Sequence, residues 1–243
     1  MKAIETRDLT KQFQDRTAVD ALNLSVEAGE FFSLLGQNGA GKTTTIKMLC
    51  CLLSPTSGSA QLFGEDIVSN PQGVKQKINL SPQETAVAPN LTVRENLMMI
   101  AQLYGQDRQT AAEQAEQYMQ LLGLADRAGD RAKKLSGGLM RRLSIAMALI
   151  TQPQVLFLDE PTLGLDVRAR RELWKLIGSL KNKVNVVLTT HYLEEAEALS
   201  DQIAVMHDGK LRAYGTPAEL MAQTGTNTFE DAFLALTETE DIA

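Results

Sequence analysis

Cysteine, histidine and long apolar runs are scarce in this sequence. Its 243 residues include two cysteines, the neighbours Cys50 and Cys51, and two histidines. Adjacent cysteines rarely pair with each other and no Cys/His spacing is typical of a zinc site, so we expect reduced structural thiols and no metal cluster. No stretch of about 18 apolar residues is present, and the N-terminal residues lack the apolar segment of a secretion signal. We therefore expect a cytoplasmic protein that does not itself span a membrane.

The sequence is also poor in clustered positive charge. It carries 30 acidic and 24 basic residues, a net charge of −6, and no long run of lysine or arginine. Such a surface does not suit the phosphate backbone of nucleic acid, so we expect no nucleic-acid partner. The hydrophobic content of 44% is enough to build a proper core at this length. Composition therefore predicts a single α/β domain.

One glycine-rich motif predicts a nucleotide site. An apolar stretch at residues 31–35 leads into a turn that matches the phosphate-binding P-loop, Gly36-Gln37-Asn38-Gly39-Ala40-Gly41-Lys42-Thr43. In such a turn the glycines let backbone N–H groups converge on phosphate oxygens, and the following helix presents its positive N-terminus. Lys42 adds a point charge, Thr43 supplies a hydroxyl ligand for Mg²⁺, and we include Thr44 among the nucleotide contacts. Kinases, GTPases, motors and transport ATPases share this motif, so the rest of the chain must name the reaction.

Hydrophobic patterning predicts alternating strands and helices. Short apolar runs bounded by turn residues predict strands at residues 3–9, 21–26, 31–35, 59–63, 155–158, 184–188 and 203–206. Helical spacing and capping signals predict helices at residues 42–53, 92–104, 110–122 and 137–151, a capped helix from Thr216-Pro217, and a short amphipathic helix before an acidic tail. Asp208-Gly209 predicts a hairpin turn. The last three strands are continuously apolar, which is typical of a parallel sheet covered on both faces.

A pair of acids follows one of these apolar runs. Asp159 and Glu160 come directly after residues 155–158, where a P-loop fold places the carboxylate that holds Mg²⁺ through water. We expect Asp159 to face the metal and Glu160 to orient or deprotonate the water that attacks the γ-phosphate.

A second phosphate-binding device lies between the P-loop and the acid pair. The stretch Leu135-Ser136-Gly137-Gly138 precedes a predicted helix, so Ser136 and two unobstructed backbone amides lie at a positive helix end. One nucleotide needs only one such site. We therefore expect this surface to meet ATP that is held by the P-loop of another copy.

In this order the motifs resemble the nucleotide-binding subunit of ABC transporters, over nearly the whole chain. The further elements of that family are Gln83 in Ser81-Pro82-Gln83-Glu84, Leu163-Gly164-Leu165-Asp166, and His191 in Thr189-Thr190-His191. The resemblance implies that Gln83 senses Mg²⁺ and the transport subunit, that Asp166 links two active sites, and that His191 contacts the γ-phosphate. Taken singly, His191 is more often a structural histidine and Gln83 a surface loop residue.

The resemblance also implies a fold and its division. We expect a RecA-like P-loop NTPase with a mostly parallel core sheet, an N-terminal antiparallel β subdomain and an inserted helical subdomain. Residues 1–243 would form one ABC ATPase domain: 1–82 and 153–215 the core with its β subdomain, 83–152 the helical subdomain, and 216–243 a short helical extension with an acidic tail.

The sequence departs from the family pattern at two positions. Leu139 stands where the signature usually ends in glutamine, and the aromatic residue that stacks on adenine, commonly tyrosine, would here be Phe13. A phenyl ring still offers a stacking face without a hydroxyl, and an ordinary core role for Phe13 is the alternative. Leu139 leaves Ser136 and the glycine amides intact, so we expect altered helix contacts and retained hydrolysis.

Within the family, the Leu139-type signature and the stretch after His191 most resemble ATPases of ABC-2 type exporters, which act with a separate membrane permease. This places the chain at the cytoplasmic face of the membrane. The segment 84–97, followed by Met98, Met99 and Ile100, is a candidate docking surface because methionine-rich patches adapt to partner helices. The alternative is that this segment is lobe core, which we favour for the methionine pair.

Two other classes remain open at this point. A GTPase would need an acidic residue where Asn182-Lys183-Val184-Asn185 has Asn185, which cannot accept the paired hydrogen bonds of guanine as a carboxylate does. A soluble ABC ATPase that acts on ribosomes or DNA usually has tandem cassettes or long inserts, which 243 residues do not accommodate.

Overall fold

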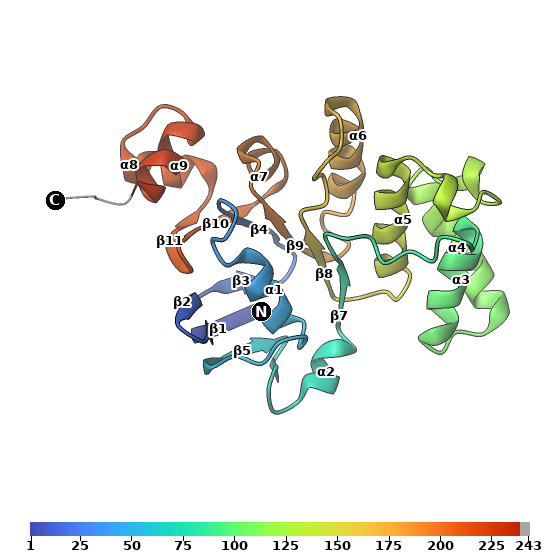
Figure 1. Ribbon diagram of the computed structural model, residues 1–243, viewed down its shortest axis with the longest axis horizontal. Coiled ribbons are helices and arrows are strands. Elements are labelled where there is room, and N and C mark those ends of the chain that lie inside the picture. Colours follow the sequence, from blue (N-terminus) through green and yellow to red (C-terminus); the bar gives the residue numbers. More distant parts are fainter. Residues whose placement is uncertain (239–243) are drawn as a thin grey trace.

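A computed structural model describes residues 1–238 and contains two β-sheets flanked by helices (Figure 1). The strands are β1 (Lys2–Phe13), β2 (Arg16–Leu22), β3 (Ser25–Glu27), β4 (Phe31–Leu35), β5 (Ser57–Leu62), β6 (Glu65–Asp66), β7 (Ile78–Ser81), β8 (Val155–Asp159), β9 (Asn185–Thr190), β10 (Gln202–His207) and β11 (Lys210–Gly215). The helices are α1 (Lys42–Leu49), α2 (Pro71–Lys75), α3 (Val93–Leu103), α4 (Arg108–Leu121), α5 (Gly137–Leu149), α6 (Val167–Gly178), α7 (Leu193–Leu199), α8 (Pro217–Thr224) and α9 (Phe229–Thr237), with short 3₁₀ helices η1 (Ala125–Arg127) and η2 (Ala132–Lys134).

The core sheet has the order β11-β10-β4-β9-β8-β7, and only β11 pairs antiparallel to its neighbour. Successive side chains of its central strands enter different cores. Leu156 and Leu158 of β8 pack with the helical lobe, whereas Val155 and Phe157 pack with α1 and the N-terminal strands. Burial on both faces explains the continuous apolar runs, and the predicted mostly parallel sheet is confirmed.

The N-terminal sheet is antiparallel, as predicted, but its strands differ from the sequence assignment. The strand expected at residues 3–9 continues as β1 to Phe13, because β2 pairs with it down to the Phe13–Arg16 pair. The single strand expected at 21–26 is wrong: β2 ends at Leu22 and β3 begins at Ser25, each pairing separately with β1. Strands β1 to β3 mix polar with apolar residues and so give a weak sequence signal, which explains why their boundaries differ from the prediction.

The helical lobe consists of α3, α4 and α5 and extends from one end of the core sheet, seen in green at the right of Figure 1. The predicted capping box is present: the Thr92 hydroxyl accepts from the Glu95 N–H, and the Glu95 carboxylate accepts from the Thr92 N–H. Val93 and Leu97 are fully buried in the lobe core. All three predicted lobe helices are confirmed to within two residues of their ends.

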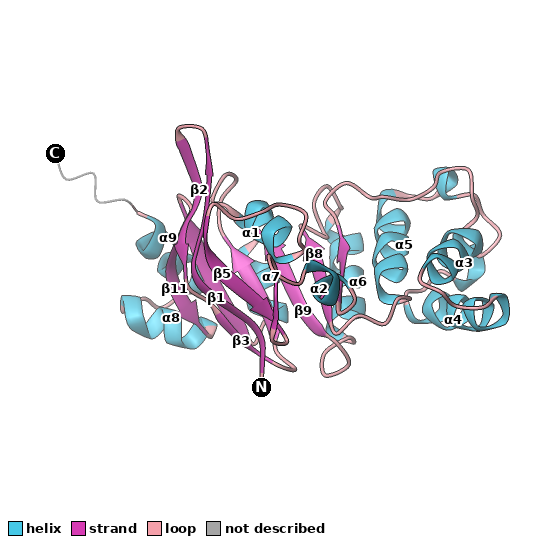
Figure 2. Cartoon of the chain, turned by 90° about the horizontal axis from the view of Figure 1, so that it is seen from below, coloured by secondary structure: helices cyan, strands magenta, loops and turns pink. Residues whose placement is uncertain are grey.

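Two C-terminal helices, α8 and α9, lie at the opposite end of the molecule (Figures 1 and 2). They follow the predicted hairpin at Asp208-Gly209, both of whose residues have positive φ. Phe229 and Phe233 of α9 pack with the outer strands β10 and β11. Part of the predicted acidic tail, residues 239–243, lies outside the described residues. Between residues 1 and 238, no helix combines the length and apolar character that a bilayer span requires.

Several elements of the fold were not expected from the sequence. The helices α2, α6 and α7 and the strand β7 were not predicted, although α2 begins with a clear signal, an Asn70 cap followed by Pro71. Strand β7 pairs with β8 and carries the chain to the loop that contains Gln83. The two cysteines differ, since Cys50 is buried and Cys51 is only partly buried. Burial raises the pKa of the Cys50 thiol well above its ordinary value, which fits a reduced structural role.

Candidate functional site: a nucleotide pocket at the strand ends

The glycine-rich turn connects the buried strand β4 to α1, and two of its glycines cannot be replaced without a clash. A Cβ atom on Gly36 would lie 2.4 Å from the Met206 carbonyl oxygen. A Cβ atom on Gly41 would lie 2.5 Å from the Ala18 carbonyl oxygen, and Gly41 also has φ of 102°. Tight packing of this backbone therefore requires glycine. The turn leaves the first amides of α1 free to bind an anion.

Lys42 is held over this turn by its own backbone. Its Nζ donates to the carbonyl oxygens of Gly36 (2.7 Å) and Gln37 (3.1 Å), and it lies 3.6 Å from Glu160 Oε1. Burial lowers the pKa of Lys42, and the nearby Glu160 carboxylate opposes this shift. The ammonium group thus lies inside the loop where a phosphate would be bound.

A hydroxyl and a carboxylate beside Lys42 form a pair suited to Mg²⁺. Thr43 Oγ1 lies 3.2 Å from Asp159 Oδ1, and the same carboxylate oxygen accepts from Thr189 Oγ1 at 2.5 Å. Mg²⁺ that accompanies a nucleotide is usually held by one or two protein oxygens together with phosphates and waters. These residues therefore fit Mg²⁺ bound with ATP. In the described part of the chain, no group of three or more His, Cys, Asp or Glu side chains is arranged to hold a metal by itself.

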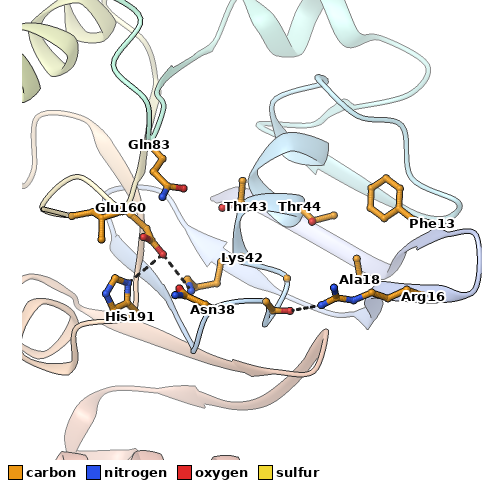
Figure 3. A pocket seen from close by; sticks show the side chains of 13 residues that line it. Phe13, Arg16, Ala18, Asn38, Lys42, Thr43, Thr44, Gln83, Glu160 and His191 are labelled. Atoms are coloured by element: carbon orange, nitrogen blue, oxygen red, sulfur yellow. Dashed lines mark hydrogen bonds and ion pairs between the residues drawn. The ribbon is translucent and has the colours of Figure 1, made fainter.

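Glu160 and His191 meet next to Lys42 (Figure 3). Glu160 Oε1 lies 3.3 Å from His191 Nδ1 and 3.6 Å from Lys42 Nζ. The backbone of Glu160 has φ of 46°, a left-handed conformation that is uncommon for a non-glycine residue. Its N–H is held by the carbonyl oxygen (3.1 Å) and the Oγ1 (3.0 Å) of Thr189. Such held strain is typical of functional positions and here aims a buried carboxylate into the pocket.

These groups share one cavity of about 530 Å³. Figure 3 shows Phe13 at one side of it and His191 at the other, with Lys42 and Thr43 between them. Phe13 is 46% exposed, so the alternative core role for its ring is not supported, and the Arg16 guanidinium donates to the Gly39 carbonyl oxygen beside it. The cavity is lined by Phe13, Arg16, Ala18, Asn38, Gly39, Gly41, Lys42, Thr43, Thr44, Gln83, Glu160, Leu163 and His191.

The predicted signature residues do not line this cavity. Ser136 caps α5 by accepting from the Leu139 N–H (3.4 Å), and Asp166 caps α6 by accepting from the Ala169 N–H (2.9 Å). The two caps belong to neighbouring helices, because a Cβ atom on Gly138 would lie 3.5 Å from the Ala169 Cβ. Leu139 is partly buried against the lobe core. The predicted site residues thus fall into two groups. The pocket group lies around the cavity, and the signature group consists of Ser136, Gly137, Gly138 and Asp166.

Three residues that sequence analysis did not single out support the pocket. Arg16 contacts the glycine-rich turn, and Thr189 holds both Asp159 and Glu160. Arg141 of α5 is buried and donates to the carbonyl oxygens of Pro82 (2.6 Å) and Gln83 (2.5 Å). Burial lowers its pKa. A polar residue directly after a buried strand was the available signal for Thr189, whereas Arg141 gave none.

The fold and this pocket define a class of protein. Residues 19–163 match the family model described as "ABC transporter", so the chain belongs to the ABC transporter family. It has the P-loop NTPase fold of the ATP-binding subunit, which is an ATPase coupled to transport, and the resemblance seen in the sequence is confirmed.

Particular relatives are, by their names, ATP-binding proteins of drug resistance and of export. The chain is 44% identical to the daunorubicin/doxorubicin resistance ATP-binding protein DrrA of Streptomyces peucetius, over 93% of this chain and 69% of that protein. It is 40% identical to the Nod factor export ATP-binding protein I of Burkholderia lata, over 93% of this chain and 75% of that protein. The chain is thus similar to ATP-binding subunits of the ABC-2 exporter group.

Solved structures agree on the fold. A structure described as the ATP binding subunit of an ABC transporter has a TM-score of 0.86 and 27% identity, covering 97% of this chain and 100% of that one. The protein cbiO1 of Clostridium perfringens has a TM-score of 0.83 at 23% identity and covers 91% of each chain. The second likeness concerns the fold alone.

We predict that Arg141→Met will loosen the Gln83 loop, because the carbonyl oxygens of Pro82 and Gln83 lose their buried donor. Losing hydrogen bonds to a charged group costs about 2 kcal/mol, which for a chain of this size lowers the melting temperature by roughly 4 to 8 °C. Hydrogen exchange of the backbone near Gln83 should speed up as well.

The control is Arg142→Met in the next position of the same helix. Arg142 donates to the half-exposed Glu172 at 2.8 Å, and an exposed ion pair contributes little. Equal effects of the two substitutions, or unchanged exchange near Gln83, would contradict the role assigned to Arg141.

Proposed function

We propose that two copies of this chain, or this chain and a close homologue, associate head to tail over two Mg-ATP molecules. Their closure and reopening would drive export through a separate membrane permease. One observation carries the proposal. The P-loop, Glu160 and His191 share a cavity, while Ser136, which caps a helix with free amides, lies outside it. A single chain therefore holds two incomplete parts of a nucleotide site.

ATP binding is proposed for the pocket group. The P-loop amides and Lys42 would hold the phosphates, and Phe13 would stack on the base. Thr43 and Asp159, with Gln83 nearby, would hold Mg²⁺, which supplies charge neutralisation between the terminal phosphates. The other residues that we propose to contact the nucleotide are those of the glycine-rich turn, Gly36, Gln37, Asn38, Gly39, Ala40 and Gly41, together with Thr44.

Hydrolysis is proposed for Glu160 with His191. The Glu160 carboxylate would orient or deprotonate the attacking water, and its neighbours Lys42 and His191 would lie against the γ-phosphate. The 3.3 Å separation between Glu160 Oε1 and His191 Nδ1 supports joint action of the two side chains at one atom.

The second copy would supply the missing half. Its Ser136 hydroxyl and the amides of Gly137 and Gly138 would meet the phosphates from the other side, as the positive end of α5. Asp166 begins α6 directly beside this helix end, so it would link the two sites. Because Leu139 is packed against the lobe core, its replacement of the usual glutamine would leave the phosphate-facing groups intact.

The permease would dock near residues 84–100, which puts the protein at the cytoplasmic face of the membrane. Because several residues of segment 84–100 are buried, only part of this segment is accessible to a partner. Val93 and Leu97 are core, and Met98 and Ile100 pack on the core, so Met99 and the exposed part of the loop at Glu84 are what a partner could contact. We propose that the chain works as one domain, 1–243, in which the lobe 83–152 moves with the permease.

We predict that Glu160→Gln will bind ATP but lose turnover by about 100-fold or more, since a general base is removed while the phosphate contacts remain. ATP should then trap a dimer that light scattering detects. The contrasting variant is Lys42→Ala, which should weaken nucleotide binding itself. Near-normal turnover of Glu160→Gln would exclude Glu160 as the base.

A mixing experiment tests the shared site. Lys42→Ala and Ser136→Arg should each be inactive alone, because each damages both sites of its own symmetric dimer. An equal mixture should recover about a quarter of the wild-type rate, since half of random pairs are mixed and each mixed pair has one intact site. No recovery on mixing, or full activity of a strictly monomeric wild-type protein on dilution, would contradict the proposal.

We predict that Met99→Glu will reduce co-purification with a polytopic membrane protein from detergent-solubilised membranes, because a charge enters an apolar docking patch. Turnover of the isolated protein should not change. Val68→Glu is the control, because Val68 is 59% exposed in the turn between β6 and α2, outside residues 84–100. Co-purification of the wild-type protein with ribosomes instead of a membrane protein would favour a non-transport ATPase.

A further inference from the structure

A third buried acid lies behind the two acids of the nucleotide pocket. Asp159 and Glu160 are 4% and 7% exposed, and the proposed chemistry uses both. Glu195 in α7 is 0% exposed, and it is not among the residues that line the nucleotide cavity. A buried carboxylate that does not line the cavity therefore lies in the first turn of α7, the helix that follows His191.

One oxygen of Glu195 accepts two hydrogen bonds from different segments. Thr162 Oγ1 donates to Oε1 at 2.9 Å, and Trp174 Nε1 donates to the same atom at 2.8 Å. Thr162 is two residues beyond Glu160 and is fully buried. Trp174 belongs to α6. The carboxylate thus joins the turn after Glu160, the helix α6 and the helix α7 at one point.

Keeping a carboxylate at this position is costly. Burial raises the pKa of Glu195 above its ordinary value, and a buried charge is tolerated only when hydrogen bonds satisfy it. An apolar side chain would fill the same volume without that cost, but it would leave the Thr162 hydroxyl and the Trp174 indole N–H without their acceptor. The benefit of the carboxylate must therefore lie in where it holds those two donors.

The two catalytic side chains flank this junction. Glu160 precedes Thr162 by two residues, and His191 precedes Glu195 by four, yet Glu160 and His191 belong to the ends of different strands, β8 and β9. Their 3.3 Å contact depends on the separation of the turn after β8 from the helix after β9. The Thr162–Glu195 hydrogen bond spans that separation directly.

We propose that Glu195 is a positioning residue that fixes the Glu160 turn against the His191 segment by accepting hydrogen bonds from Thr162 and Trp174 at a single carboxylate oxygen. The inference rests on the roles proposed above for Glu160 and His191. Through Trp174 the same contact reaches α6, whose first turn carries Asp166, so a shift of α6 on dimer closure would be felt at the catalytic pair.

The chain offers its own reporter of this contact. Trp174 is the single tryptophan among the 243 residues, and its indole N–H is one of the two donors. Its emission in nucleotide-free protein reads the state of the contact without any catalysis. This measurement separates failure of the positioning role from failure of the ATPase chemistry, which Glu160→Gln tests.

The variants to compare are Glu195→Gln, Glu195→Ala and Thr162→Val, with Glu197→Ala as the control. Glutamine keeps an acceptor oxygen that can serve Thr162 and Trp174 but carries no charge. Alanine removes the acceptor altogether. Valine keeps the shape of Thr162 without its hydroxyl. Glu197 is an exposed acid on the same helix, so its loss changes charge without touching the contact.

We expect Glu195→Ala to lower kcat by about tenfold, with the ATP dissociation constant changed by less than about threefold and with altered Trp174 emission before nucleotide is added. Thr162→Val should lower kcat severalfold at wild-type melting temperature. Glu195→Gln should keep at least about half of the wild-type kcat together with wild-type emission, and Glu197→Ala should match wild type in every measurement.

Two results would overturn the proposal. The first is wild-type kcat in Glu195→Ala or, should that variant not fold, in Thr162→Val. The second is a Glu195→Gln variant that folds normally but is as impaired as alanine, since this would mean that the charge matters and not the acceptor. Normal turnover of Glu160→Gln would instead contradict the catalytic role proposed for Glu160. It would not affect the change in Trp174 emission that we expect for Glu195→Ala.

Discussion

The organisation of this protein depends on one carboxylate oxygen, Asp159 Oδ1, which accepts hydrogen bonds from the hydroxyls of Thr43 and Thr189. These three residues come from α1, β8 and β9, so a single atom brings together the first turn after the glycine-rich loop and the ends of two neighbouring strands. The same Thr189 also holds the N–H of Glu160. The pair proposed to hold Mg²⁺ and the acid proposed as the general base are therefore positioned by one short network, and a displacement of any of its segments would move them together.

This network is accurate only because the sheet beneath it is rigid. The strands β4, β8 and β9 run parallel and adjacent, and their side chains alternate between the lobe core and the core around α1. A register shift by one residue would exchange the two apolar faces and move every strand end at once. Packing on both faces therefore determines where Asp159 and Thr189 lie. The geometry at the strand ends thus depends on the buried side chains of the strands that lead to them. The glycine-rich turn adds a second constraint, since Gly36 and Gly41 permit close approach of backbone carbonyl groups that any side chain would block.

Much of this could be predicted from sequence, because the signals were local. Three motifs depend only on neighbouring residues: a phosphate-binding turn after an apolar strand, two acids after another strand, and a helix cap followed by two glycines. In the structure, residues of the first two motifs line one cavity.

The residues that were not predicted depend on contacts between distant segments. Arg141 reaches the Gln83 loop from α5, and Glu195 contacts Thr162 and Trp174, which are 33 and 21 residues away. In the sequence, Glu195 is one acid among several in an amphipathic stretch, and nothing local distinguishes it from the exposed Glu194. The boundaries of β1 to β3 differ from the prediction for a related reason, since strands with many polar residues are defined by their pairing and not by their own composition.

The pocket group and the signature group lie apart, and their residues are held in place in different ways. Lys42, Asp159 and Glu160 are buried, and their positions are fixed by hydrogen bonds within the core. Ser136 and Asp166 cap helices that belong to the lobe and its neighbour, and neither residue lines the pocket of its own chain. An enzyme that needed both groups at one phosphate would have to deform this core or use a second molecule. Because a packed sheet resists deformation far more than a subunit contact does, association is the less costly solution. Association would also give the contacts of Arg141 and Trp174 a role, since they connect the lobe and α6, where a partner would bind, to the residues proposed to carry the chemistry.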